Sequence, residues 1–372
     1  MNLSEICPNT NLSWLLTNTL FLTKHGSHAY GTNTPTSDLD IRGICIASKD
    51  HYIGTKVFEQ ATFSQPHDVV IFDIKKFVKL ALDFNPNAVE ILFTDPADHY
   101  FVRDEIKGLI EHKEKFISKR ARYTLSGYAT AQLKRIKLHR KYILNPINSK
   151  PTRSDFGLPD GRTLIPQHQL LEIEDAVKKK LSEWQFDSTG LDDAASIEIR
   201  SKISDMFVDM KINTDELEIY AARSLGLDDN LLDAFKSERQ YRTAKREYDN
   251  YVNWKNTRNK ERYAIEEKWG FDLKHSMHLV RLMRECREVL TTGKVLVKRH
   301  DAQELLAIKN GAWTYEQLIE WADQQDKEMD ELYKTSTLPK EPDRNFIEGL
   351  MMDIIESFLF TSKTRSVVPD AF

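Results

Sequence analysis

The sequence has little cysteine and no long apolar run, and each absence excludes a class of protein. Cys7, Cys45 and Cys286 are the only cysteines in 372 residues, and they lie far apart without CxxC spacing. Neither a disulfide framework nor a structural zinc site built on cysteine is therefore expected. No window approaches the ~20 apolar residues that a membrane helix needs, and no targeting signal opens the chain. We expect a cytoplasmic protein without a membrane partner.

An excess of positive charge is absent too. The formal net charge is −4, with 30% charged and 40% hydrophobic residues. This composition supplies apolar material for real cores beneath a highly charged surface. A nucleic-acid partner would have to be met by a local basic patch. The length exceeds what one hydrophobic core usually organises, so two domains are expected, and the oligomeric state is left open.

The pattern of the sequence changes near residue 110. Before it, short apolar runs at 20–23, 41–47 and 69–72 predict buried strands. Asp73 follows the third run and precedes apolar residues at helical spacing, so we expect it to cap a helix. Beyond residue 110 the period is helical, and the helices are expected near 115–143, 166–185, 193–211, 214–224, 228–268, 272–291, 301–308, 314–334 and 343–361.

The stretch from His25 to Gly43 reads HGSHAYGTNTPTSDLDIRG and carries the clearest chemical signal. Gly26 and Ser27 stand at the start of a predicted helix, where backbone amides and a hydroxyl can hold a phosphate. Asp38 and Asp40 alternate on a predicted strand, so their carboxylates point to one side. Two such carboxylates favour hard divalent cations, which assist phosphoryl chemistry. The combination indicates nucleotidyl transfer from a nucleoside triphosphate.

Gly-Ser followed by ten residues and Asp-x-Asp resembles the signature of the DNA polymerase β nucleotidyltransferase superfamily. More narrowly, the chain resembles polymerase β-like nucleotidyltransferases predicted to act in RNA repair in bacteria and their phages. Three further blocks carry this resemblance, namely NPNAVEILF at 85–93, WKNTRNKERYAIEEKWGFDLKHSMHLVRLMRE at 254–285 and LLAIKNGAWTYEQL at 305–318.

The resemblance implies an α+β fold. A polymerase β-like core, a mixed sheet with flanking helices, would occupy residues 1–110, and a large mainly α-helical domain, able to bind substrate or RNA, would occupy 111–372. It also implies a third metal-binding carboxylate on a later strand. Asp68 is preferred for this role over Asp73, which is the expected helix cap, and over Glu90.

The implied activity is the transfer of a nucleoside monophosphate from an NTP to a hydroxyl, with release of pyrophosphate. Asp38, Asp40 and Asp68 would bind two Mg²⁺ ions, with Mn²⁺ as an alternative. The favoured acceptor is an RNA or tRNA end. One alternative is the same reaction with a protein or small-molecule hydroxyl as the acceptor. The other is a nucleotide- or RNA-binding module without turnover.

Other charged residues have both a functional and a structural interpretation. Arg42 could orient a phosphate or pair with a carboxylate. Lys134, Lys137 and Lys141 form one stripe of a predicted helix, which could follow an RNA backbone or simply face solvent.

A group that follows Gly270 begins another predicted helix. Its Lys274 and His278 could face phosphate, as the resemblance suggests, or line the core. His275 and His278 could also share a zinc ion, although the sequence nominates no third ligand.

Overall fold

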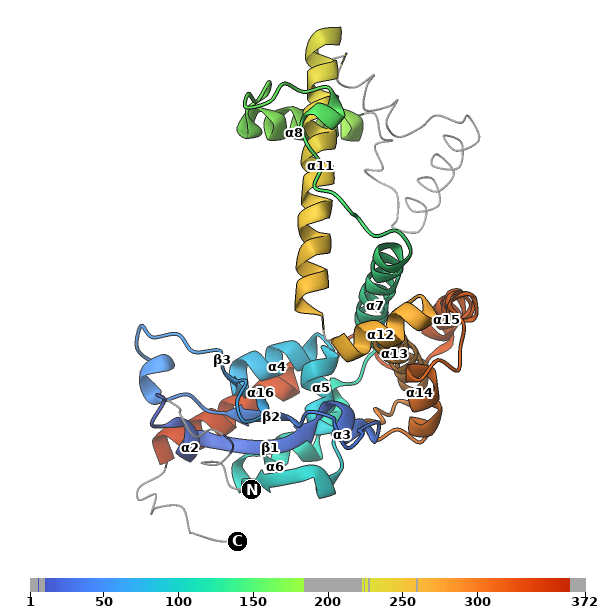
Figure 1. The fold of residues 1–372 in the computed structure, drawn as a ribbon. Coiled ribbons are helices and arrows are strands. Elements are labelled where there is room, and N and C mark those ends of the chain that lie inside the picture. The colour runs from blue at the N-terminus through green and yellow to red at the C-terminus, as the bar shows by residue number, and fades with distance from the viewer. Residues whose placement is uncertain are drawn as a thin grey trace. The chain divides into compact units, whose positions relative to one another are not determined.

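The computed structural model describes residues 6, 11–183, 223, 225–226, 228–258 and 260–361. The chain folds into two compact units. Figure 1 colours the ribbon by residue number, so the segments of each unit can be located. The first unit combines residues 1–144 with 264–372, and the second is the insertion 145–263. These bounds do not coincide with the predicted domains, 1–110 and 111–372, because helices beyond residue 264 pack with the N-terminal part.

The first unit contains a five-stranded mixed sheet in the order β3-β4-β2-β1-β5. β1 is antiparallel to both β2 and β5, β3 is antiparallel to β4, and β2 and β4 run parallel. The strands are β1 (Thr19–His25), β2 (Asp40–Cys45), β3 (Gln60–Phe63), β4 (Asp68–Asp73) and β5 (His99–Val102).

Both faces of this sheet are buried. On one face, Phe21, Ile44 and Phe72 belong to the main core, which continues into the helices. On the other face, Leu22 and Ile71 belong to a smaller core, which also contains apolar residues from near the N-terminus. Burial on both faces explains why the central strands read as continuous apolar runs in the sequence. Edge strands β3 and β5, which are short and less apolar, were not predicted.

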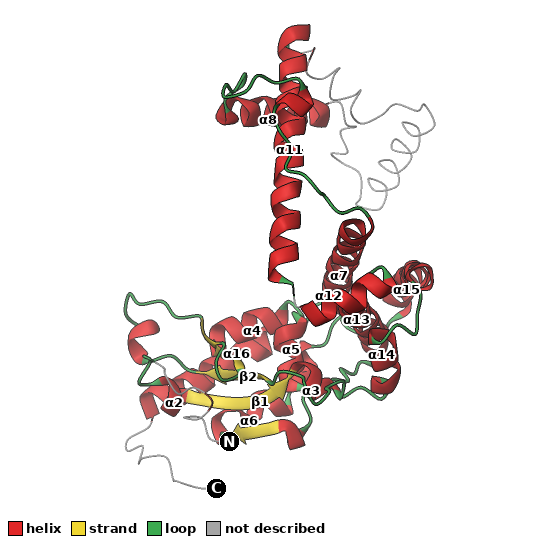
Figure 2. Ribbon diagram, viewed as in Figure 1, coloured by secondary structure: helices red, strands yellow, loops and turns green. Residues whose placement is uncertain are grey.

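Helices complete the first unit (Figure 2). α13 packs against α7, α14 and α15, and α16 packs against α4 and α6. Their bounds are α2 (Leu15–Asn18), α3 (Gly26–Tyr30), α4 (Ile74–Leu82), α5 (Pro86–Leu92), α6 (Asp104–Glu111), α7 (Arg120–Leu144), α13 (Leu273–Thr292), α14 (Ala302–Lys309), α15 (Tyr315–Thr335) and α16 (Arg344–Glu356), followed by a π-helical turn (Ser357–Thr361).

The second unit is helical in the residues that the structure describes. α8 (Gln167–Glu183) and α11 (Asp229–Thr257) share a small apolar core that includes Leu170, Val177 and Phe235. α12 (Lys260–Trp269) begins in this unit and ends in the first. The predicted helices at 193–211 and 214–224 lie outside the described residues.

The α+β fold predicted from the sequence is confirmed. All three predicted strands are present, and Asp73 caps α4 by accepting a hydrogen bond from the Lys75 amide at 2.9 Å. The single helix predicted over 228–268 was wrong, because α11 ends at Thr257 and Arg258 is extended, with φ −78° and ψ 138°. Asparagine and threonine favour helices weakly, which explains a break near residue 257.

No helix within the described ranges combines the length and the apolar character that crossing a bilayer requires.

Candidate active site

The Gly-Ser turn lies directly against the aspartate strand. His25 ends β1 and pairs with Asp40 at the start of β2, and Gly26 then opens α3. Gly26 has φ +60°, and a Cβ placed on it would lie 2.1 Å from Oδ2 of Asp40. Both the backbone angle and the contact therefore require glycine at this position. The turn and the carboxylate form one site.

Asp68 is the neighbour of Asp40 across the parallel strands. The two residues are register partners at the start of β4 and β2. Partial burial raises the pKa of Asp40, Arg42 opposes this, and the charge and hydrogen bonding of Asp68 raise it further. The two carboxylates are therefore close enough to repel each other when both are ionised.

Arg42 supplies positive charge beside this pair. Its guanidinium lies 3.8 Å from Asp40 Oδ1 and 3.5 Å from Asp68 Oδ2, beyond hydrogen-bonding distance of either oxygen. It donates instead to the backbone carbonyls of Ile41 and Asp68, each at 2.9 Å. Arg42 is thus anchored by the backbone and faces both acids.

Asp38 and Ser27 lie in segments adjoining the pair. Asp38 is exposed and precedes β2 by two residues, and Ser27 is half-buried in α3. Among the residues that the structure describes, the donor oxygens of Asp38, Asp40 and Asp68 do not all lie within 4.8 Å of one another. The structure pairs Asp40 with Asp68 across the two strands, and Asp38 lies in the loop residues just before β2.

The two other acids considered for the third position have different partners. Asp73 caps α4 and accepts a hydrogen bond from the Tyr52 hydroxyl at 2.5 Å. Glu90 is buried in α5, where its two oxygens bind Arg281 at 2.8 Å and the Tyr30 hydroxyl at 2.5 Å. Only Asp68 of the three is paired with Asp40 across β2 and β4.

Helix α13 contributes charge to the same site. Lys274 lies in its first turn and is near enough to Asp40 to lower the pKa of that carboxyl. His278 is one turn further along, and burial lowers its pKa to about 3, with a smaller effect from the charge of Arg281. His278 is therefore neutral at physiological pH, and Lys274 is the cation that α13 presents to the aspartates.

A buried polar cluster that the sequence did not predict lies behind the turn. Arg281 of α13 donates to Glu90 at 2.8 Å and to Glu285 at 2.9 Å, and its guanidinium stacks 4.0 Å from the centre of the Tyr30 ring. His25 approaches Glu90 at 3.5 Å, but burial lowers the pKa of His25 to about 4, so this is not an ion pair at neutral pH. The cluster ties α3 to α5 and α13.

Lys134, Lys137 and Lys141 are all exposed on α7, as the stripe predicts. Lys137 also lines an open hollow of about 700 Å³ in the first unit together with acidic residues of α15, namely Glu316, Glu320 and Asp323. In the second unit, a separate hollow of about 370 Å³ is lined by Arg239, Arg242 and Arg246 of α11. These three arginines are spaced i, i+3 and i+7, so the sequence alone could have predicted that they share one face of a helix.

A mixed sheet with a Gly-Ser turn against paired strand aspartates is what the resemblance to polymerase β-like nucleotidyltransferases implies. Residues 2–144 match the family model described as the RNA repair pathway DNA polymerase beta family. The match confirms the predicted resemblance over this part of the chain. The description implies a polymerase β-like nucleotidyltransferase of an RNA repair pathway. Searches of curated proteins and of solved structures gave no match.

Proposed function

We propose that this protein transfers a nucleoside monophosphate from an NTP to a hydroxyl at an RNA or tRNA end and releases pyrophosphate. The observation that carries the proposal is the contact of Gly26 with Asp40, beside Asp68, within the segment that matches the family. Because Gly26 has no side chain, the Asp40 carboxylate can lie against the start of α3, where the backbone amides of the turn would hold a phosphate.

The donor set fits hard divalent ions. Asp38, Asp40 and Asp68 offer carboxylate oxygens, the ligands that Mg²⁺ prefers, and Mn²⁺ accepts the same set. Partial burial and, to a smaller extent, the charge of Asp68 raise the pKa of Asp40, and a bound cation would favour the ionised form against both effects. Two ions held here would supply activation of the acceptor hydroxyl and charge neutralisation at the transferring phosphorus.

The other residues of the site have roles that follow from their charge and position. Ser27 and the backbone of Gly26 would hold the phosphates that leave as pyrophosphate. Arg42 and Lys274 place positive charge on two sides of the aspartates, where a triphosphate would be attracted. Neutral His278 could donate or accept one hydrogen bond to the nucleotide.

An RNA acceptor is supported by the family description and by the exposed lysines of α7. The acidic residues of α15 beside Lys137 would repel a phosphate backbone, so Lys134 and Lys141 would carry more of the contact. Changing Lys134, Lys137 and Lys141 together to Glu should weaken RNA binding and flatten its salt dependence. Binding of equal strength and equal salt dependence in this variant would move the RNA elsewhere, with the arginines of α11 as the next surface to change.

The proposal is tested by incubating the protein with Mg²⁺, each α-labelled NTP in turn and total tRNA. An Asp38→Ala, Asp40→Ala double variant serves as the matched control. Label in RNA that depends on the two aspartates would support the proposal and name the base. Label in protein or in a small molecule would move the acceptor, and no label with any acceptor would favour a nucleotide- or RNA-binding module without turnover.

A further inference from the structure

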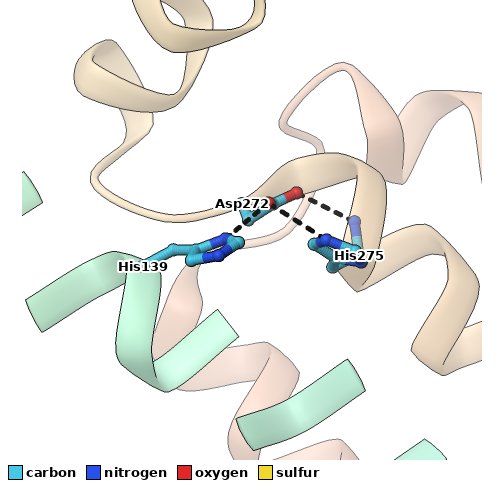
Figure 3. A group of neighbouring side chains, drawn as sticks. All are labelled: His139, Asp272 and His275. Carbon is cyan, nitrogen blue, oxygen red and sulfur yellow. Dashed lines mark hydrogen bonds and ion pairs between the residues drawn. The ribbon is translucent and has the colours of Figure 1, made fainter. Parts of the chain in front are cut away.

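Two histidines and an aspartate meet where α7 packs against the first turn of α13, as Figure 3 shows. Nδ1 of His139 lies 2.9 Å from Oδ2 of Asp272, and Nε2 of His275 lies 3.6 Å from the same oxygen. One donor atom from each residue falls within 4.8 Å of the other two. None of the three belongs to the aspartate site described above.

We propose that His139, Asp272 and His275 form a binding site for a divalent transition-metal ion, with Zn²⁺ as the best fit. Two imidazoles and one carboxylate are a ligand set that zinc accepts with a fourth position open to water. Zinc bonds of about 2.0–2.1 Å in a tetrahedron separate neighbouring ligand atoms by roughly 3.3 Å. The two distances to Asp272 lie on either side of this value, so small side-chain rotations would close the site.

Gln132 of α7 orients one of the ligands. Its Oε1 lies 2.6 Å from Nδ1 of His275 and can only accept a hydrogen bond. Nδ1 therefore carries a proton, and Nε2 is the ring nitrogen that faces Asp272 and would bind the metal once it is deprotonated. A hydrogen bond that fixes the non-ligating nitrogen is the usual support of a metal-bound histidine.

The backbone of α13 holds Asp272 in place, and the two histidines are partly exposed to solvent. Asp272 is the N-cap of α13, where its other oxygen accepts the His275 amide at 2.9 Å. The side chain of Asp272 is 3% exposed, that of His139 12% and that of His275 24%. A metal ion could thus enter from solvent and would join the long helix α7 to the start of α13, two residues from Lys274.

This site would differ in metal preference from the aspartate site. Imidazole ligands favour zinc, nickel or copper over magnesium, whereas Asp38, Asp40 and Asp68 offer oxygen alone. Excess Mg²⁺ should therefore leave zinc binding unaffected, and zinc binding should persist when the aspartate site is disabled. The inference stands independently of whether the protein transfers nucleotides.

The test is calorimetric titration of the full-length, chelator-treated protein with ZnCl₂ in the presence of excess Mg²⁺. We expect one zinc ion per chain, with affinity reduced on the order of 10- to 100-fold or more in His139→Gln and in His275→Gln. His278→Gln, on the same helix, is the matched control and should bind as the wild type does. Co²⁺ should give visible absorption that both ligand variants lose.

A second variant and a second measurement distinguish loss of a metal ligand from loss of folding. Asp272→Asn retains a side chain that caps helices but removes the anionic ligand, so it should stay folded by circular dichroism and still bind zinc weakly. Zinc should raise the thermal unfolding midpoint of the wild type by several degrees and that of Asp272→Asn much less. Absence of stoichiometric binding, or binding unchanged in both histidine variants, would overturn the proposal.

Discussion

Arg42 and Arg281 are two of the arginines in the first unit that bring a pair of carboxylates together, and they do so at different distances. At the strand ends, Arg42 lies 3.5–3.8 Å from Asp68 and Asp40, whose side chains are 52% and 29% exposed. In the interior, Arg281 binds Glu90 and Glu285 at 2.8–2.9 Å, and both acids are 1% exposed.

The difference separates a site from a structural cluster. A buried ion pair is stable only when hydrogen bonds compensate the loss of water, and Arg281 supplies them. The aspartates keep contact with solvent and are only loosely compensated by Arg42, so their oxygens remain accessible to another cation. Similar residue types are thus accessible to solvent in one place and part of the packing in the other.

The largest effect is expected at the strand ends. Asp40→Asn should reduce nucleotidyl transfer on the order of 10²–10³-fold, because the anionic ligand is lost. The same change should leave the free energy of unfolding unchanged or raise it, since the site already raises the pKa of Asp40 and so disfavours its charged form. Transfer assays and urea unfolding check both parts.

Asp104→Asn, at an exposed position in the first turn of α6, is the control for this prediction and should leave transfer unchanged. A large loss of stability in Asp40→Asn would mean that the aspartate is part of the packing, and the comparison would fail.

The interior cluster should respond in the opposite way. Arg281→Met should destabilise the protein by about 3–5 kcal/mol, because the charge of Glu90 would remain buried without its partner. Burial raises the pKa of Glu285 to about 8, so this second acid is largely protonated at neutral pH and contributes less. Arg344→Met breaks an exposed i, i+4 pair with Glu348 and should cost under about 1 kcal/mol. The measurement is the free energy of unfolding in urea. Equal effects of the two changes would contradict the assignment of Arg281 to the core.

Acid should weaken the interior cluster through His25. Burial lowers the pKa of His25 to about 4 in the folded protein, while the unfolded value stays near 6.5, so the unfolded chain binds more protons between these values. Stability is therefore complete above about pH 6.5 and is lost as the pH falls toward 4. His25 alone should cost about 2 kcal/mol between pH 7.5 and pH 5.

Unfolding curves of wild type and His25→Gln at the two pH values isolate this contribution. The variant should lose less stability on acidification than the wild type does. Identical pH dependence would show that His25 is charged or solvated in the folded state.

A smaller effect on stability than that of Arg281→Met is expected at the glycine turn. Gly26→Ala and Gly157→Ala both force a side chain into a positive φ, at +60° and +67°, which costs about 1 kcal/mol or more. A Cβ at Gly157 meets no atom within 4 Å, whereas at Gly26 it displaces Asp40. Gly26→Ala should therefore also reduce transfer about tenfold or more, and Gly157→Ala should not. Equal activity of both variants would separate the turn from the aspartate site.

The sequence predicted what depends on local pattern. Apolar runs located β1, β2 and β4, and helical period located α13, α14 and α15 to within a few residues. The i, i+2 spacing placed Asp38 and Asp40 on one strand, whereas β2 begins at Asp40. Asp68 was nominated from the family pattern, and its position beside Asp40 follows from parallel pairing that no local signal encodes.

What depends on distant contacts could not be predicted. Glu90 and Arg281 are 191 positions apart, and His139 and Asp272 are 133 apart. His275 was expected to share any zinc ion with His278, which is its neighbour in sequence. Helix packing instead brings His139 to it, with the centres of the two rings 5.6 Å apart.

The first unit is built from two segments that are far apart in the sequence, and this affects how it can fold during synthesis. The family-matching segment ends at residue 144, yet its core is completed by α13, α14, α15 and α16, and Lys274 and Arg281 lie on α13. During synthesis, residues 145–263 leave the ribosome before these helices do. The N-terminal segment therefore keeps apolar surface uncovered until α13 to α16 have been synthesised and can pack against it.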